Sequence, residues 1–85
     1  MKHAGAAVLD TLEPLLAEIR ALPGLKEKSR GCFYRKGRGF LHFHEDPKGL
    51  FADLSDAAGP GFERLDVTAE AGKRALMAAA RARLG

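Results

Sequence analysis

Apolar residues recur every three or four positions between residues 6 and 22, and this spacing predicts a helix with one apolar face. Pro23-Gly24 is expected to end the helix, because proline cannot continue the hydrogen-bond ladder and glycine readily adopts a left-handed cap. Pro14 lies within the pattern and is expected to kink or split the helix, which makes Thr11 an alternative start. The apolar face comprises Val8, Leu9, Leu12, Leu15, Leu16, Ile19 and Leu22.

After Gly24 the period changes to two, which is typical of strands. A tight turn is expected at 36–39, which contains two glycines, and a second turn at 46–49. The second has Asp first, Pro to preset the next position, and Gly where a positive φ is needed. A loop is expected at 57–61. The predicted strands are 32–35, 40–44, 50–54 and 62–67, with a further exposed or edge strand at 25–29.

Thr68 is expected to be the N-cap of a second helix that runs to about Leu84. Glu70 falls in its first turn, where a negative charge complements the helix dipole. The order helix, antiparallel meander, helix predicts a two-layer α+β fold, with three to five strands flanked by an N-terminal and a C-terminal helix. A chain of 85 residues is expected to form one domain with one core.

The turn at 46–49 and the apolar alternation together predict which strand residues face one another. If Glu45 lies opposite Leu50, Leu41 and Phe43 share the core face with Ala52 and Leu54. The same register sets His42 across from Asp53 and His44 across from Phe51. On the preceding strand, Cys32 and Tyr34 are expected to face the core. The second face is then predicted to carry Phe33, Arg35, Phe40, His42, His44, Phe51 and Asp53.

Three phenylalanines on that second face would form an exposed apolar patch, which usually marks a surface for a ligand or a partner. A small ligand, another protein or a second copy of the chain in a homodimer are all compatible with it. The alternative is that a helix or the loop at 57–61 covers this face.

The two histidines of the His-x-His stretch are candidate metal ligands, because residues two apart on a strand point to the same side. Asp53 opposite His42 would complete a site of His42, His44 and Asp53 for a divalent metal, with open positions. The alternative is that His42 simply hydrogen-bonds Asp53, while His44 is solvated near Glu45. A His42–Asp53 pair is also compatible with acid–base catalysis, but no activated nucleophile lies beside it.

Basic residues gather with aromatic ones between positions 26 and 38, a combination that can contact phosphates and stack bases. Lysines on an edge strand also discourage pairing between sheets, so nucleic-acid binding is not favoured. The net charge of +3 permits an acidic partner without implying one. One cysteine excludes an intramolecular disulfide, and the first residues predict neither a signal peptide nor a membrane span. A soluble cytoplasmic protein is therefore expected.

The run Gly37-Arg38-Gly39-Phe40-Leu41-His42-Phe43-His44 resembles the Gly-x-x-Phe-x-His-x-His stretch of the luciferase-domain family. It is most similar to short bacterial members, in which a strand like Leu50–Leu54 follows. The resemblance implies no light emission, since most members have no assigned activity, and it carries over only His42 and His44. Glu45-Asp46 before the proline departs from the pattern of longer members, as does the lack of a tryptophan-containing C-terminal segment.

These observations favour a small soluble binding module that uses the Phe/His face of its sheet to contact a ligand or protein partner. A metal- or His-dependent enzyme using His42, His44 and Asp53 is the first alternative. A nucleic-acid-binding domain using the basic 26–38 region is the second.

Overall fold

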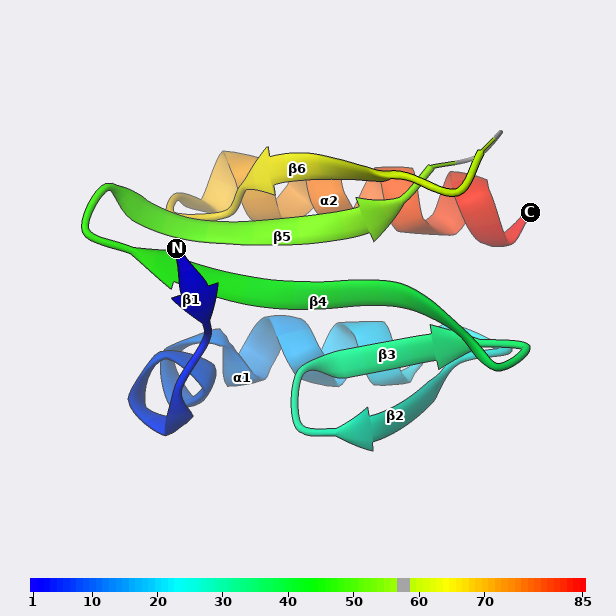
Figure 1. Cartoon of the computed structure of the whole chain (residues 1–85), viewed down its shortest axis with the longest axis horizontal. Coiled ribbons are helices and arrows are strands. Elements are labelled where there is room, and N and C mark those ends of the chain that lie inside the picture. Colours follow the sequence, from blue (N-terminus) through cyan, green and yellow to red (C-terminus); the bar gives the residue numbers. More distant parts are fainter. Residues whose placement is uncertain (57–58) are drawn as a thin grey trace.

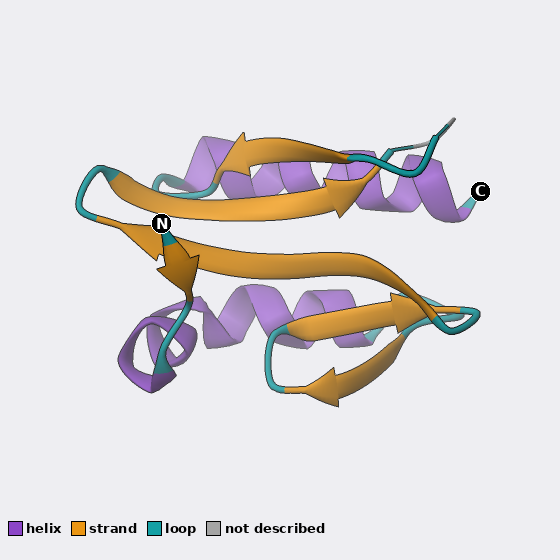
Figure 2. Ribbon diagram, in the orientation of Figure 1, coloured by secondary structure: helices purple, strands orange, loops and turns teal. Residues whose placement is uncertain are grey.

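The chain forms one antiparallel sheet with both helices packed on the same side of it (Figures 1 and 2), as a computed structural model shows for residues 1–56 and 59–85. The strand order is β2-β3-β4-β5-β6, and the short β1 pairs with the end of β4. The predicted two-layer α+β fold is confirmed. The elements are β1 Lys2–His3, α1 Ala6–Arg20, β2 Lys26–Ser29, β3 Cys32–Arg35, β4 Arg38–Asp46, β5 Gly49–Ser55, β6 Phe62–Asp66 and α2 Glu70–Leu84.

Helix α1 forms where the apolar periodicity predicts it, and it contains Pro14 without being split. A proline in a helix interior costs about 3 kcal/mol, so packing must offset that cost. Five of the helix's apolar residues are buried against the sheet: Leu9, Leu12, Leu15, Leu16 and Ile19. The helix also meets α2 through Arg74, whose guanidinium donates to both carboxylate oxygens of Glu18 at 2.7 and 2.6 Å.

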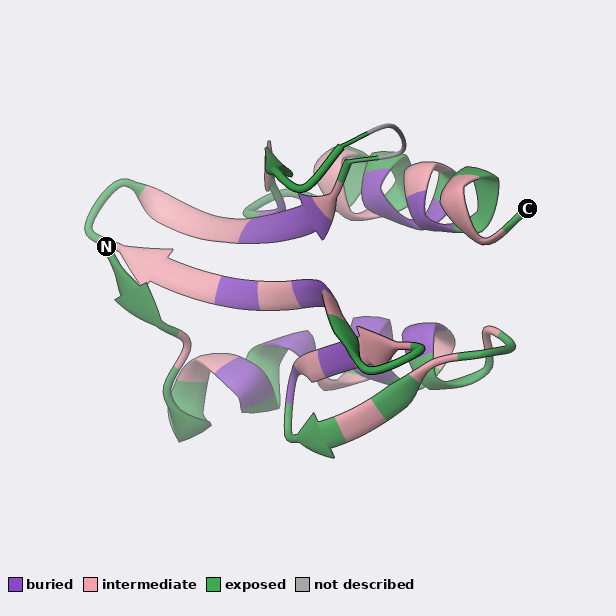
Figure 3. Ribbon diagram, turned by 45° about the vertical axis from the view of Figure 1, so that its right-hand side comes forward, coloured by how far each residue is buried: buried purple, intermediate pink, exposed green. Residues whose placement is uncertain are grey.

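Strands β4 and β5 pair in the predicted register. Leu41 lies opposite Leu54 and Phe43 opposite Ala52, and all four side chains are buried. Buried and half-buried residues alternate along the middle of β4 (Figure 3), since every second side chain points away from the helices. The connecting turn is stabilised by Asp46, whose Oδ1 accepts a hydrogen bond from the Lys48 amide at 3.0 Å.

The turn between β3 and β4 is shorter than predicted, and it is followed by a bulge. Lys36 and Gly37 both have positive φ, +53° and +80°, as in the tight two-residue turns that join antiparallel strands. Beyond it, Tyr34 pairs with Gly39 but Phe33 pairs with Leu41, so Phe40 is an extra residue on β4.

This bulge corrects the predicted orientation of β3. Without it, Cys32 would lie opposite Leu41 on the core face and Phe33 opposite Phe40 on the other. With it, Phe33 joins Leu41 and Cys32 lies opposite His42. Phe33 and Phe40 are both buried in the core, at 1% and 4% exposure, rather than on the second face. The helix side of the sheet gains two large aromatic side chains by this shift.

The start of α2 also differs from the prediction. Its N-cap is Ala69, without a side-chain hydrogen bond, and not Thr68. The Thr68 hydroxyl instead accepts a hydrogen bond from the Leu50 amide at 2.9 Å, so it ties the start of the helix to β5. A strand contact therefore takes the place of the expected cap.

The predicted loop at 57–61 lies partly outside the described residues, because 57 and 58 are not among them. Its described ends approach one another, since the Asp56 amide donates to the Gly61 carbonyl at 2.9 Å. In the described part of the chain, no helix is both long enough and apolar enough to cross a membrane.

The close approach of α2 to the end of β6 gives a test of the fold. A Cβ on Gly72 would collide with the backbone carbonyl of Asp66. A glycine-to-alanine change within a helix ordinarily stabilises it by up to about 1 kcal/mol. We expect Gly72→Ala to lower the free energy of unfolding by about 1–3 kcal/mol, because the helix must move away from the sheet. Urea unfolding measures the change.

Gly59→Ala is the control for this substitution. A Cβ at Gly59 would meet no atom within 4 Å, so its free energy of unfolding should stay within about 0.5 kcal/mol of that of the unchanged chain. A Gly72→Ala variant more stable than the unchanged chain would contradict the packing of α2 described above.

Candidate functional site

The sheet surface turned away from both helices carries the predicted histidines, and we call it the open face. His42 and His44 point to it because Leu41 and Phe43, their neighbours along β4, are buried on the opposite side. Phe51 of β5 lies opposite His44, and Asp53 lies opposite His42. The open face is defined by His3, His42, His44, Phe51, Asp53, Phe62 and Arg64.

His3 completes a cluster of three histidines. The antiparallel pairing of β1 with β4 sets His3 opposite His44, and the Ala4 amide donates to the Phe43 carbonyl at 3.0 Å to hold the segment there. The ring centroid of His3 lies 4.7 Å from that of His44 and 6.0 Å from that of His42. Sequence reasoning missed His3, because a two-residue strand shows no periodicity.

The ring nitrogens of the cluster are close enough to converge on one ion. Nδ1 of His42 lies 3.1 Å from Nε2 of His44, and one nitrogen from each of the three rings lies within 4.8 Å of the others. Two nitrogens bound to one tetrahedral zinc at about 2.0–2.1 Å lie about 3.3 Å apart. The His42–His44 pair is close to this spacing, and a nitrogen of the exposed His3 lies within 4.8 Å of both.

Asp53 lies beside the cluster and is held by Arg64 of β6. The guanidinium donates to both carboxylate oxygens, from Nε at 2.8 Å and from Nη2 at 2.9 Å. His44 Nε2 is 3.1 Å from Oδ2 of the same carboxylate. The hydrogen bonds from Arg64 lower the pKa of Asp53, so the carboxylate stays ionised beside the rings. Asp53 thus meets His44 rather than His42, its partner in the sequence-based alternative.

Burial lowers the pKa of His42, and the nearby rings of His44 and His3 lower it further, although the Asp53 charge opposes them. His42 is therefore held in its neutral form, in which a ring nitrogen is free to bind a metal.

Two phenylalanines border the cluster, and only one of them was predicted. Phe51 is half-buried opposite His44. Phe62, at the start of β6, is 44% exposed, and its ring centroid lies 5.0 Å from that of His42. The apolar part of the open face is thus made by Phe51 and Phe62, because Phe33 and Phe40 belong to the core.

The remaining predicted site residues are dispersed. Arg35 points to the helix side, where its Nη1 donates to the carbonyl of Arg83 in α2 at 2.9 Å. Within the basic 26–38 region, Arg30 is drawn to α1 by Asp10 and Glu13, at 2.7 and 2.8 Å. Lys28 lies over the Tyr34 ring, 4.2 Å from its centroid. This region therefore does not form one continuous basic surface.

The lowered pKa of His42 predicts a pH dependence of stability in the metal-free protein. The unfolded chain binds a proton at this residue as the pH falls through about 6.5, before the folded chain does. The free energy of unfolding should therefore fall from pH 7 to pH 5, above the range in which Asp53 titrates. His42→Gln should lose less stability over the same interval in urea unfolding with a chelator present. Equal losses in both proteins would contradict this account of His42.

No protein-family model, curated protein or solved structure matches this chain. The resemblance of residues 37–44 to the luciferase-domain family therefore stays a prediction. Its two histidines are nonetheless those that stand together with His3 on the open face.

Proposed function

We propose that this chain is a small soluble binding module whose open face holds a divalent transition metal through His3, His42 and His44. One observation carries the proposal: the pairing of β1 with β4 brings His3, which is far away in sequence, to His42 and His44, and ring nitrogens of all three lie within 4.8 Å of one another. His42 and His44 share a side through strand alternation, and the pairing of β1 with β4 adds His3 to them.

The donor set indicates which ions fit. Imidazole nitrogens suit zinc, copper, nickel and iron, whereas magnesium and calcium prefer oxygen ligands. Three protein ligands leave at least one coordination position for water or for a donor atom of another molecule. That position would open toward the surface bordered by Phe51 and Phe62, where an incoming ligand or protein partner could also bury apolar area.

Asp53, held by Arg64, would influence the site through its charge. Its Oδ2 lies 3.1 Å from Nε2 of His44, the nitrogen that also faces Nδ1 of His42, so it does not accept from the far nitrogen of the ring as an orienting carboxylate would. An ionised carboxylate beside the ring nitrogens offsets the positive charge of an ion, and Arg64 holds both of its oxygens. The set His42, His44 and Asp53 stays a prediction from the sequence, and the convergence of the three rings, together with the hydrogen bonds from Arg64 to both oxygens of Asp53, favours the three histidines.

Binding is a better supported use of the site than catalysis. Hydrolysis at a metal needs a base near the metal-bound water, and the nearest carboxylate, Asp53, is bound by Arg64 and has a lowered pKa. The metal-dependent enzyme therefore stays the second candidate.

The proposal is tested by titrating metal into the protein without a histidine tag. Zinc at an equimolar amount should shift the ring signals of His3, His42 and His44 together in the NMR spectrum. Replacing any one histidine by alanine should weaken binding by roughly 100-fold, and Asp53→Asn by about tenfold, because the negative charge beside the ion is lost. Unshifted rings at a tenfold excess of zinc would refute the metal site.

Lys2→Ala is the matched control. Lys2 neighbours His3 on β1 and is highly exposed, so removing its side chain should leave zinc affinity unchanged. Analytical ultracentrifugation of the zinc-loaded protein measures its molecular mass. The mass distinguishes a metal bound within one chain from a metal bound between two copies. Dimerisation with zinc would assign the open face to a homodimer.

A further inference from the structure

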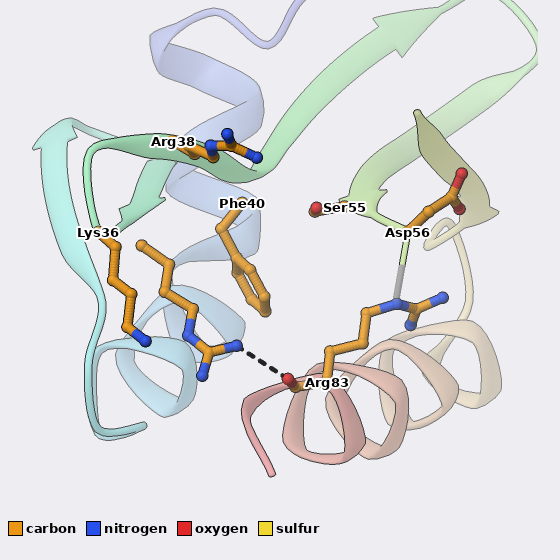
Figure 4. Close-up of a pocket in the computed structure, with 7 residues that line it drawn as sticks. Lys36, Arg38, Phe40, Ser55, Asp56 and Arg83 are labelled. Atoms are coloured by element: carbon orange, nitrogen blue, oxygen red, sulfur yellow. Dashed lines mark hydrogen bonds between the residues drawn. The ribbon is translucent and has the colours of Figure 1, made fainter. Parts of the chain in front are cut away.

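A second site lies at the other end of β4, on the helix side of the sheet. A pocket of about 390 Å³ opens between the β3–β4 turn, the end of β5 and the last turn of α2 (Figure 4). Four cationic side chains line it, from Arg35, Lys36, Arg38 and Arg83, against one carboxylate, that of Asp56. None of these residues belongs to the histidine cluster.

Most arginines of the chain form ion pairs with carboxylates, but two of those that line this pocket do not. Of the eight arginines in the sequence, five form ion pairs with carboxylates: Arg20, Arg30, Arg64, Arg74 and Arg83. Within residues 1–56 and 59–85, the three without a carboxylate partner are Arg35, Arg38 and Arg81. Two of these three line the pocket, and Lys36 beside them also has no carboxylate partner there.

Contacts with α2 and β6 hold the guanidiniums of Arg35 and Arg83 in place. Arg35 donates to the Arg83 carbonyl at 2.9 Å, and Nη2 of Arg83 donates to Glu63 at 2.6 Å. Nε of Arg83 is buried and has no hydrogen-bond partner among the described residues. Because this atom has no solvent contact, an anion in the pocket would meet the terminal nitrogens of the guanidiniums and not Nε of Arg83.

The β3–β4 turn supports the same conclusion. Lys36 has a φ of +53°, a conformation for which asparagine or glycine would be the ordinary choice. A lysine with this positive φ raises the conformational free energy of the backbone. Its side chain places an ammonium group beside the pocket. Arg38 follows one residue after the turn glycine, and in Figure 4 its side chain lies across the pocket from Arg83.

We propose that this pocket binds the phosphate group of a small phosphorylated molecule. Planar guanidiniums match the oxygens of a phosphate, and several of them in one pocket favour a dianion over a carboxylate. The volume lies at the lower end of the range for small-molecule sites, which leaves room for more than the phosphate alone. The buried Phe40 ring forms an apolar wall for the rest of the molecule, and Ser55 and Asp56 offer partners for its hydroxyls.

A nucleic-acid strand fits this arrangement less well. A continuous backbone needs cations along a track, whereas Arg30 is paired to α1 and Lys28 lies over the ring of Tyr34. The pocket gathers its charge at one point, as a terminal phosphate requires.

The experiment compares four probes at constant ionic strength: inorganic phosphate, glucose 6-phosphate, glucose and a short single-stranded oligonucleotide. Metal-free His42→Ala protein is used alongside the unchanged chain, so that phosphate held by a metal in the histidine cluster is recognised. Backbone amides of residues 36–39, 55–56 and 83–85 should shift with phosphate in both proteins. Glucose 6-phosphate should bind more tightly than phosphate, and glucose should not bind.

Three variants distinguish binding in this pocket from nonspecific attraction of an anion to the positively charged protein. Arg38→Gln and Lys36→Asn should each weaken binding of glucose 6-phosphate about tenfold, and Lys36→Asn relieves the turn, so its folding is not at risk. Arg81→Gln removes an arginine that lies outside the pocket and has no carboxylate partner among residues 1–56 and 59–85, and it should leave binding unchanged. Equal weakening by Arg81→Gln, tighter binding of the oligonucleotide, or no shift at about 10 mM phosphate would each overturn the proposal.

Discussion

The alternation of side chains across β4 is the constraint on which the rest of this structure depends. Leu41 and Phe43 can be buried only on the side where α1 and α2 pack, and their burial forces His42 and His44 to the opposite side. Because α1 and α2 cover the same face, neither of these two described helices covers the histidines. The hydrophobic core therefore fixes the position of the candidate metal site without contributing any of its ligands.

One interruption of this alternation divides β4 into two halves, each of which contributes to one of the two proposed sites. The bulge at Phe40 turns two consecutive side chains, Phe40 and Leu41, toward the helices. On one side of it the strand carries the histidines on the open face. On the other side it contributes Arg38 and Phe40 to the pocket beside α2. One nine-residue strand can in this way line two sites on opposite faces of a thin sheet.

The sequence was sufficient to predict the β4–β5 hairpin, because a strong turn signal at 46–49 and an unbroken apolar alternation agreed on one register. It was insufficient at β3, where Cys32, Phe33 and Phe40 suit either face and only packing against α1 and α2 decides between them. His3 and Arg64 were missed for another reason. Each reaches the site through pairing of its strand with a distant partner, and neither strand has a buried face that would reveal its register.

The central claim, that His3, His42 and His44 bind one ion together, is tested most directly by X-ray absorption spectroscopy of the zinc-loaded protein. Three imidazole nitrogens at about 2.0–2.1 Å, with one further light-atom ligand, are the predicted result. Cys32 lies opposite His42 on β3 and is the alternative donor nearest in register. A sulfur ligand at about 2.3 Å, or a first shell with fewer than three imidazoles, would contradict the three-histidine site.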